Sequence, residues 1–210
     1  LCLDDTNLPS IIPQIELRLI TYGFTTQADV FGREDSFAEF RSTSSLFYKN
    51  RELGTLRLQV PGRHNISNAM AAVAVGLDLD IPPKVILQAL ADYTGTGRRF
   101  ELKKVVNDIM VVEDYGHHPT EIRATLDAAK RGWPRRVVAV FQPHRYTRLS
   151  HLMDEFATSF NQADILLVTE IYAAGEDPMP DVTGKVLFEE IKQFGHKNVF
   201  FEPDLKDIPG

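Results

Sequence analysis

Residues 113–121 read EDYGHHPTE and place a carboxylate, a phenol and two imidazoles directly after an apolar run. Asp114 could accept hydrogen bonds from ribose hydroxyls, as acids at strand ends do in nucleotide-binding sheets. Tyr115 could form the wall of a small pocket. His117 and His118 are adjacent and point in different directions, so they do not readily ligate one metal ion. We therefore expect a ligand-binding loop here, without a metal site.

A second polar segment, FQPHRYTR at residues 141–148, contains His144, Arg145 and Arg148. The two arginines are three positions apart, so they share a face if a helix has begun. Two guanidinium groups on one face would suit a single carboxylate ligand. The alternative is a solvated surface face without a ligand.

A third segment, GTGRRFE at residues 95–101, places Arg98 and Arg99 beside two glycines. Paired guanidinium groups can bind phosphate oxygens bidentately, although two solvated arginines at a hinge are an equally good interpretation. These glycines do not form a phosphate-binding P-loop, because the pattern G-x-x-x-x-G-K-[ST] occurs nowhere in the sequence.

The segment PGRHNISNAMAA, residues 61–72, opens a predicted helix with His64, Asn65 and Asn68. Amide side chains offer both a donor and an acceptor, so they can recognise the edge of an adenine base. A helix N-terminus also favours anions. Taken alone, the segment is better explained by one asparagine capping the helix.

The composition is that of a globular protein, with 43% hydrophobic and 25% charged residues among 210. The net charge of −6 argues against nucleic acid as a partner. No apolar run approaches the roughly 20 residues that cross a bilayer. Cys2 is the only cysteine, and the first residues include Asp4 and Asp5 without a basic stretch. We expect a cytoplasmic protein without a membrane partner.

The first half of the chain is predicted to be rich in strands. The expected strands are residues 15–22, 27–32, 37–41, 45–49 and 54–60. The first residues, LCLDD, resemble the end of a buried strand. An alanine-rich helix at 64–79 suits close packing on a sheet, and Pro82 and Pro83 open a second helix that ends near Ala91. We place a domain boundary between residues 94 and 95.

The second half alternates between strands and helices. The expected strands are residues 101–106, 109–114, 136–141, 164–169 and 198–202, and the expected helices are 119–131, 148–162 and 183–194. Pro119 suits a first helical turn, Thr183 an N-cap and Gly195 a C-terminal cap. Strands that are apolar on both faces predict a Rossmann-like, mostly parallel sheet with helices on both faces. The loops after three of these strands should share one sheet edge.

These motifs, together with YAAGEDP at residues 172–178, resemble the Mur ligases in the same order along essentially the whole chain. The resemblance implies a partial α/β central ATPase domain without its P-loop at 1–94. It implies a C-terminal domain lacking its last strand at 95–210. It also implies an ATP-dependent ligase that adds L-alanine to UDP-N-acetylmuramate through an acyl phosphate. The Mg²⁺ ligands are expected mainly outside these residues, and the 210 residues alone are expected to lack turnover.

The resemblance implies a role for each candidate residue: Asn65 and Asn68 at the nucleotide base, Arg98 or Arg99 at the γ-phosphate, Asp114 at the ribose, Tyr115 and His117 in the alanine pocket, and Arg145 and Arg148 at the alanine carboxylate. His117 and Arg99 are the expected catalytic residues. Two alternatives are a murein-peptide recycling ligase of the same family and a nucleotide-binding module without catalysis. Tyr115-Gly116 and HRYTR distinguish the chain from the recycling ligase.

Overall fold

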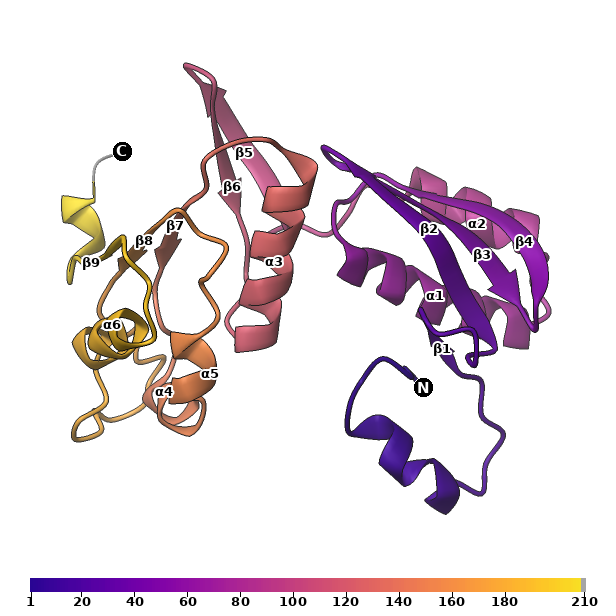
Figure 1. The fold of residues 1–210 in the computed structure, drawn as a ribbon, viewed down its shortest axis with the longest axis horizontal. Coiled ribbons are helices and arrows are strands. Elements are labelled where there is room, and N and C mark those ends of the chain that lie inside the picture. Colours follow the sequence, from indigo (N-terminus) through magenta and orange to yellow (C-terminus); the bar gives the residue numbers. More distant parts are fainter. Residues whose placement is uncertain (209–210) are drawn as a thin grey trace. The chain divides into compact units, whose positions relative to one another are not determined.

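The computed structural model describes residues 1–208 and contains two compact units (Figure 1). Unit 1 comprises residues 1–102 and 131–133, and unit 2 comprises residues 103–130 and the chain from 134 onward. Residues 209 and 210, the end of the predicted second domain, lie outside the described residues.

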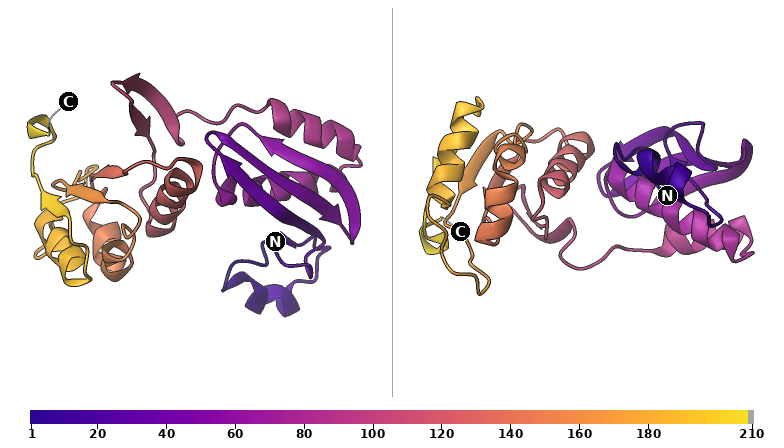
Figure 2. Two further views of the ribbon diagram at one scale, coloured as in Figure 1. Left: turned by 45° about the horizontal axis from the view of Figure 1, so that its top comes forward. Right: turned by 90° about the horizontal axis from the view of Figure 1, so that it is seen from below.

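Unit 1 is a four-stranded sheet packed on two helices (Figures 1 and 2). Its elements are η1 (Leu8–Gln14), β1 (Tyr22–Gly23), β2 (Val30–Ala38), β3 (Arg41–Tyr48), β4 (Arg51–Leu58), α1 (Arg63–Asp78) and α2 (Pro83–Asp92). β1 is parallel to β2, and the other pairs are antiparallel. Leu46 and Leu56 of the sheet pack with Ile66 and Met70 of α1, which confirms the predicted helix on a sheet.

The strand predicted at residues 15–22 is wrong except at Tyr22. The alternation there has no neighbouring strand to bury it, and Leu17 is 82% exposed. The expected buried strand at the start is also wrong, because only Cys2 pairs, through an isolated parallel bridge to Tyr22. The strands predicted at 27–32 and 37–41 form one strand, β2, whose register shifts between Arg33 and Ser36. Such bulges insert a residue without ending the strand.

Unit 2 contains a three-stranded parallel sheet in the order β7-β8-β9 and a separate two-stranded sheet. Its elements, of which β5 and α3 each include two residues assigned to unit 1, are β5 (Glu101–Val106), β6 (Ile109–Glu113), α3 (Pro119–Gly132), β7 (Val138–Phe141), α4 (Tyr146–His151), α5 (Met153–Ala157), β8 (Ile165–Val168), α6 (Gly184–Gln193), β9 (Val199–Phe201) and η2 (Leu205–Asp207). This arrangement confirms the α/β class with a parallel sheet. The helix predicted at 148–162 is instead two short helices, which are separated at Leu152.

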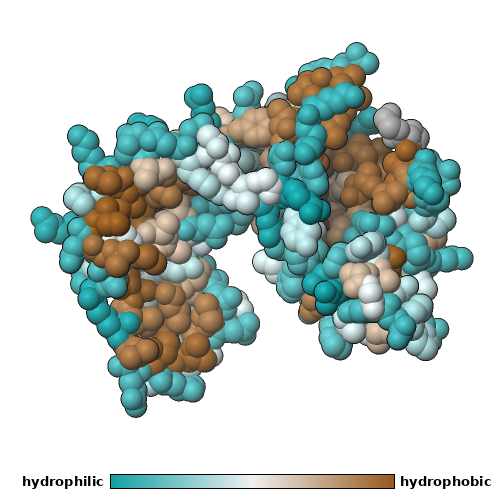
Figure 3. Space-filling model, turned by 180° about the vertical axis from the view of Figure 1, so that it is seen from behind, coloured by the Kyte–Doolittle hydropathy of each residue, from teal (hydrophilic) through white to brown (hydrophobic). Residues whose placement is uncertain are grey.

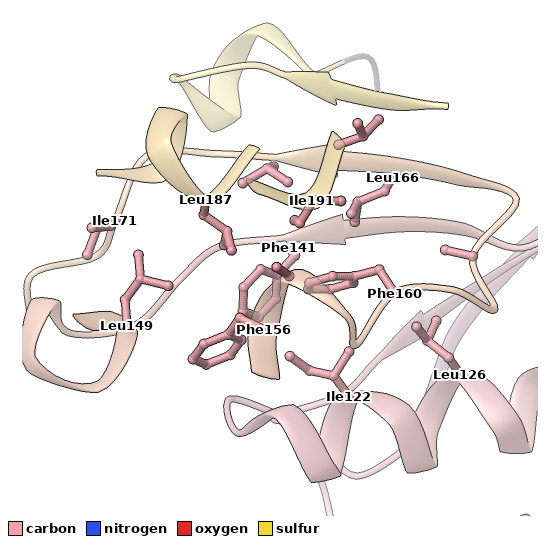
Figure 4. Packing of buried hydrophobic residues seen from close by; sticks show 14 of the residues in the cluster. Ile122, Leu126, Phe141, Leu149, Phe156, Phe160, Leu166, Ile171, Leu187 and Ile191 are labelled. Atoms are coloured by element: carbon pink, nitrogen blue, oxygen red, sulfur yellow. The ribbon is translucent and has the colours of Figure 1, made fainter. Parts of the chain in front are cut away.

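The core of unit 2 lies between the parallel sheet and its helices (Figure 4). Phe141 of β7 packs against Phe156 and Phe160, with ring centroids 5.8 and 5.0 Å apart. Other buried members of this core are Ile122, Leu126, Leu149, Leu166, Val168, Leu187 and Ile191. On the other face of the sheet, Val138 and Phe200 remain about half exposed. Helices were predicted on both faces, but within residues 1–208 they cover one face of the parallel sheet.

Apolar side chains also reach the surface outside this core (Figure 3). They gather on the helices of unit 1, where Val75, Leu79 and Val85 are each more than half exposed. Val105 and Ile109 are similarly exposed on the two-stranded sheet. Within residues 1–208, no helix is both long and apolar enough to span a membrane.

Local signals in the sequence fix the ends of α3 and α6. Pro119 opens α3 as predicted. The Thr183 hydroxyl accepts a hydrogen bond from the Val186 N–H at 3.1 Å, and Gly195 follows α6 with φ +98°. Gly184 has a further reason to be glycine, because an added Cβ would overlap the Thr169 carbonyl oxygen. The start of α6 therefore packs directly on the chain that leaves β8.

This close approach predicts the effect of Gly184→Ala on stability. At an open helical position, glycine-to-alanine stabilises a helix by about 1 kcal/mol. Here the added methyl group meets backbone, so we expect Gly184→Ala to lower the unfolding free energy of unit 2 by about 3 kcal/mol, at the upper end of overpacking costs. Thr183→Ala, which removes only the cap, should cost about 1 kcal/mol. Urea unfolding followed through amide signals of β7 to β9 measures both, and an equal or smaller loss for Gly184→Ala would contradict the packing argument.

Candidate functional site

The loops that follow β6, β7 and β8 meet at one edge of unit 2, as predicted. His144 forms an isolated parallel bridge with Tyr172. The Arg145 N–H donates to the Tyr172 carbonyl at 2.9 Å, and the Tyr172 N–H donates to the Pro143 carbonyl at 2.8 Å. The ring of His117, from the loop after β6, lies 6.1 Å from the His144 ring. One small area therefore receives side chains from all three loops.

Four rings form a continuous row across these loops. Tyr115 meets His117 edge-on at 4.9 Å, His117 lies 6.1 Å from His144, and His144 lies 5.4 Å from Tyr172. Tyr115 and Tyr172 at the two ends are 42% and 56% exposed. A ligand could therefore pack against their faces. Tyr172 was not singled out from the sequence, although it lies directly after a predicted strand end.

Hydrogen bonds to the backbone hold the loop at residues 114–121. Asp114 Oδ1 accepts from the Gly116 N–H at 2.6 Å, so part of this carboxylate shapes the loop. Glu121 Oε2 accepts from the N–H groups of His117 and His118, at 2.9 and 3.1 Å. His117 Nδ1 lies 2.8 Å from the Tyr115 carbonyl oxygen, which can only accept. This contact assigns a hydrogen to Nδ1, so the lone pair of the neutral ring is on Nε2.

The two arginines of the second loop have different surroundings. Arg145 has φ +75° and precedes the first residue of α4, so the condition for a shared helix face, that a helix has begun at Arg145, is not met. The Arg145 guanidinium is half exposed, and its Nη1 lies 4.0 Å from Glu176 Oε1. Arg148 Nη1 donates to the His144 carbonyl at 3.2 Å and lies 3.4 Å from His144 Nδ1. Both guanidinium groups nevertheless flank the His144–Tyr172 bridge.

Within residues 1–208, Glu176 is the only carboxylate recorded as an ion-pair partner of Arg145. Its Oε1 accepts from the Thr147 hydroxyl at 2.7 Å, and its Oε2 accepts from the Thr147 N–H at 3.0 Å. These two Thr147 hydrogen bonds, with a smaller effect of Arg145, hold the pKa of Glu176 below its usual value. The group is therefore ionised at neutral pH. Glu176 was not singled out from the sequence, although it is one of the two acids of YAAGEDP.

His144 lies among all of these charges. Burial lowers the pKa of His144 first, and the positive charges of Arg148 and Arg145 lower it further. His117 adds to this effect, while Glu176 opposes it. The imidazole is therefore neutral at pH 7, and the positive charge of the cluster is that of the two guanidinium groups.

In unit 1, neither asparagine of the segment PGRHNISNAMAA caps α1. The N-cap residue is Gly62, which offers no side chain. Asn65 Nδ2 donates to the Pro61 carbonyl at 2.7 Å, and Asn68 Nδ2 lies 3.5 Å from Asn65 Oδ1. The capping alternative is therefore wrong. Asn68 is exposed on the first turns of the helix, where its amide can meet a ligand.

Arg99 lines a cavity of about 330 Å³ within unit 1. The other lining residues are Phe40, Gln59, Val60, Pro61, Thr94, Gly95, Thr96, Gly97, Phe100, Glu101 and Leu102. Arg98 has φ +61°, and its N–H donates to Glu101 Oε2 at 2.7 Å. The two arginines thus have different environments, and only Arg99 borders this cavity.

Within residues 1–208, no group of three or more histidine, cysteine, aspartate or glutamate side chains is placed to hold a metal ion. The expectation that Mg²⁺ ligands lie mainly outside this chain stays a prediction.

Two family models match the chain. The model described as "Mur ligase, glutamate ligase domain" matches residues 98–209, which include the three-loop cluster. The chain belongs to the Mur ligases. A second model, "Mur ligase middle domain", matches residues 1–76. Members of this family are ATP-dependent.

Individual Mur ligases give a consistent comparison. The chain is 51% identical over 208 residues to a UDP-N-acetylmuramate–L-alanine ligase of Syntrophotalea carbinolica, covering 99% of this chain and 45% of that protein. It is 30% identical to the solved UDP-N-acetylmuramate-alanine ligase of Thermotoga maritima, with a TM-score of 0.72 over 91% of this chain and 42% of that chain. A solved murein peptide ligase of Psychrobacter arcticus is 27% identical, with a TM-score of 0.57 over 86% of this chain and 37% of that chain. The chain thus spans less than half the length of these relatives.

The surroundings of His144 predict its titration in this Mur ligase chain. Its pKa should lie below 6.5, so the unfolded chain binds more protons than the folded chain below that pH. The unfolding free energy should therefore fall as the pH drops from about 6.5 through the lower pKa of folded His144. Arg148→Met should raise the pKa of His144, and Glu176→Gln should lower it further. Imidazole NMR titration measures these values, and a pKa at or above 6.5 in the unmutated chain would contradict the assignment.

Proposed function

We propose that the full-length protein containing this chain joins L-alanine to the muramoyl carboxylate of UDP-N-acetylmuramate and cleaves ATP to ADP and phosphate. The observation that carries the proposal is the pair of guanidinium groups beside the His144–Tyr172 bridge, together with the row of rings that joins Tyr115 and His117 to His144. A small amino acid has one carboxylate, which the two arginines could bind, and a short side chain, which would fit beside the wall formed by Tyr115. The ligases named for this reaction share 51% and 30% identity with the chain.

The reaction would proceed in two steps. The muramoyl carboxylate attacks the γ-phosphorus of ATP, forming an acyl phosphate and releasing ADP. The neutral amine of alanine then attacks the acyl carbon, and phosphate leaves as the amide bond forms. Alanine that arrives with an ammonium group must lose two protons in all, one to water before the attack, which gives the neutral amine, and one as the amide forms; the lone pair of His117 Nε2 can accept the second. Arg145 and Arg148 would fix the alanine carboxylate and thereby aim the amine.

The nucleotide would be recognised by the remaining candidate residues. We assign Asn65 and Asn68 to the base, Asp114 to the ribose, and Arg99 or Arg98 to the γ-phosphate. Arg99 is favoured because it borders a cavity, and a guanidinium there could stabilise charge on the transferring phosphoryl group. The division into a partial central domain at 1–94 and a C-terminal domain at 95–210, the cytoplasmic location and the absence of nucleic-acid or membrane partners remain part of this proposal.

Arg145→Lys tests the carboxylate site. Lysine keeps the charge but loses the two parallel donors of the guanidinium group. In the full-length protein, we expect the KM for alanine to rise roughly 10- to 150-fold. This factor corresponds to the loss of about 1.5–3 kcal/mol, the contribution of one hydrogen bond to a charged group. The KM for ATP should change far less. A normal KM for alanine, with only a lower melting temperature, would show that Arg145 merely ties the loop together.

Tyr115→Ala tests the wall of the alanine pocket. The phenol should exclude larger side chains by overlap, so its removal should lower the preference for alanine over valine. The ratio of the two kcat/KM values measures this preference in the full-length protein. Tyr93→Ala is a control, because Tyr93 is also an exposed tyrosine but lies in unit 1. An unchanged ratio in Tyr115→Ala would remove Tyr115 from the pocket wall.

A further inference from the structure

We propose that Glu176 binds the α-ammonium group of the amino-acid substrate while Arg145 binds its carboxylate. The inference rests on the proposed function and names the form of substrate that this cluster selects, which is a zwitterion. A cationic group, Arg145, and an anionic group, Glu176, lie next to each other here. A site for a carboxylate alone would need only the arginines. Glu176 would thus be a substrate-binding residue from the third loop.

The spacing of the two charged groups fits a zwitterion. Arg145 Nη1 and Glu176 Oε1 are 4.0 Å apart, beyond a hydrogen bond but close enough to flank one small ligand. In an α-amino acid, ordinary bond lengths leave the nitrogen and the nearer carboxylate oxygen about 2.7 Å apart. Charge-assisted hydrogen bonds of about 2.7–2.9 Å from each protein group would close a four-sided arrangement with the ligand. The protein spacing needs no change for this contact.

Glu176 can accept another donor in this position. Each carboxylate oxygen has about two lone-pair sites; Thr147 occupies one on each oxygen, and a weaker contact from the Tyr146 N–H takes at most one more. The side chain of Glu176 is 21% exposed, so a small ligand can approach it. The Arg145 guanidinium makes no hydrogen bond within residues 1–208, so its donors are available to the carboxylate end of the same ligand.

The competing explanation is that Glu176 only holds the start of α4 through Thr147. A purely structural role would disturb Arg145 and hence any carboxylate ligand. An ammonium contact instead affects only ligands that carry an ammonium group. Propionate distinguishes the two explanations, because it has the carboxylate and the carbon chain of alanine but no amine.

The test measures the binding of L-alanine and of propionate to the full-length protein by titration calorimetry. In the unmutated protein, alanine should bind more tightly than propionate. In Glu176→Gln, the Kd for alanine should rise roughly 10- to 150-fold, as expected for a lost charged hydrogen bond. The Kd for propionate should stay within about twofold.

Two controls separate this contact from general damage. Glu170→Gln changes another carboxylate of the region after β8, which accepts from the Gly184 N–H at 2.7 Å, and should leave both Kd values unchanged. Thr147→Val removes one hydrogen bond to Glu176 but keeps its charge, so the ratio of the two Kd values should persist.

Three outcomes would overturn the inference: equal binding of alanine and propionate to the unmutated protein, a parallel loss of both ligands in Glu176→Gln, or no loss of either. The proposed function is tested separately by phosphate release with ATP, UDP-N-acetylmuramate and alanine. A protein that binds alanine through Glu176 but releases no phosphate would refute the ligase assignment and leave the ammonium site intact.

Discussion

The candidate site depends on the backbone bridge between His144 and Tyr172. Two hydrogen bonds, Arg145 N–H to Tyr172 and Tyr172 N–H to Pro143, continue the pairing of β7 and β8 beyond their ends. They hold Arg145 at φ +75°, a region that costs about 1–3 kcal/mol for a residue other than glycine. Such backbone strain persists only where surrounding contacts hold the residue in place. With this conformation Arg145 stays outside α4, and its guanidinium Nη1 lies 4.0 Å from Glu176 Oε1.

The meeting of the loops after β7 and β8 could be predicted from the sequence, whereas their contacts could not. Parallel strands bring their carboxyl ends to one edge whatever the loop sequences are, so alternating apolar and helical segments were sufficient for these two loops. Tyr172 and Glu176 were missed because their partners, His144 and Thr147, are 28 and 29 residues away. No local spacing encodes contacts of that kind. The left-handed conformation of Arg145 equally requires the neighbouring loop.

The same distinction, between signals within a turn and contacts between distant segments, explains which helices and strands were predicted correctly. Pro119, Thr183 and Gly195 act on the turns that contain them, and each lies where the sequence predicts it. The segment at 15–22 failed because alternation indicates a strand only where a neighbour exists to pair with it. The helix expected at 148–162 failed because apolar periodicity persists across the break at Leu152. Both segments have a strong local pattern that tertiary packing does not follow.

The two guanidinium groups are not equivalent, although the sequence presents them as a pair. Arg148 is partly buried and directed by the His144 carbonyl and ring, so its position depends on an imidazole that stays neutral. Protonation of His144 would replace an acceptor with a third cation and push Arg148 away. Within residues 1–208, the guanidinium of Arg145 has only the Glu176 carboxylate beside it, at 4.0 Å. We infer that Arg148 and His144 define the shape of the site, and that Arg145 is the group whose donors a carboxylate ligand meets first.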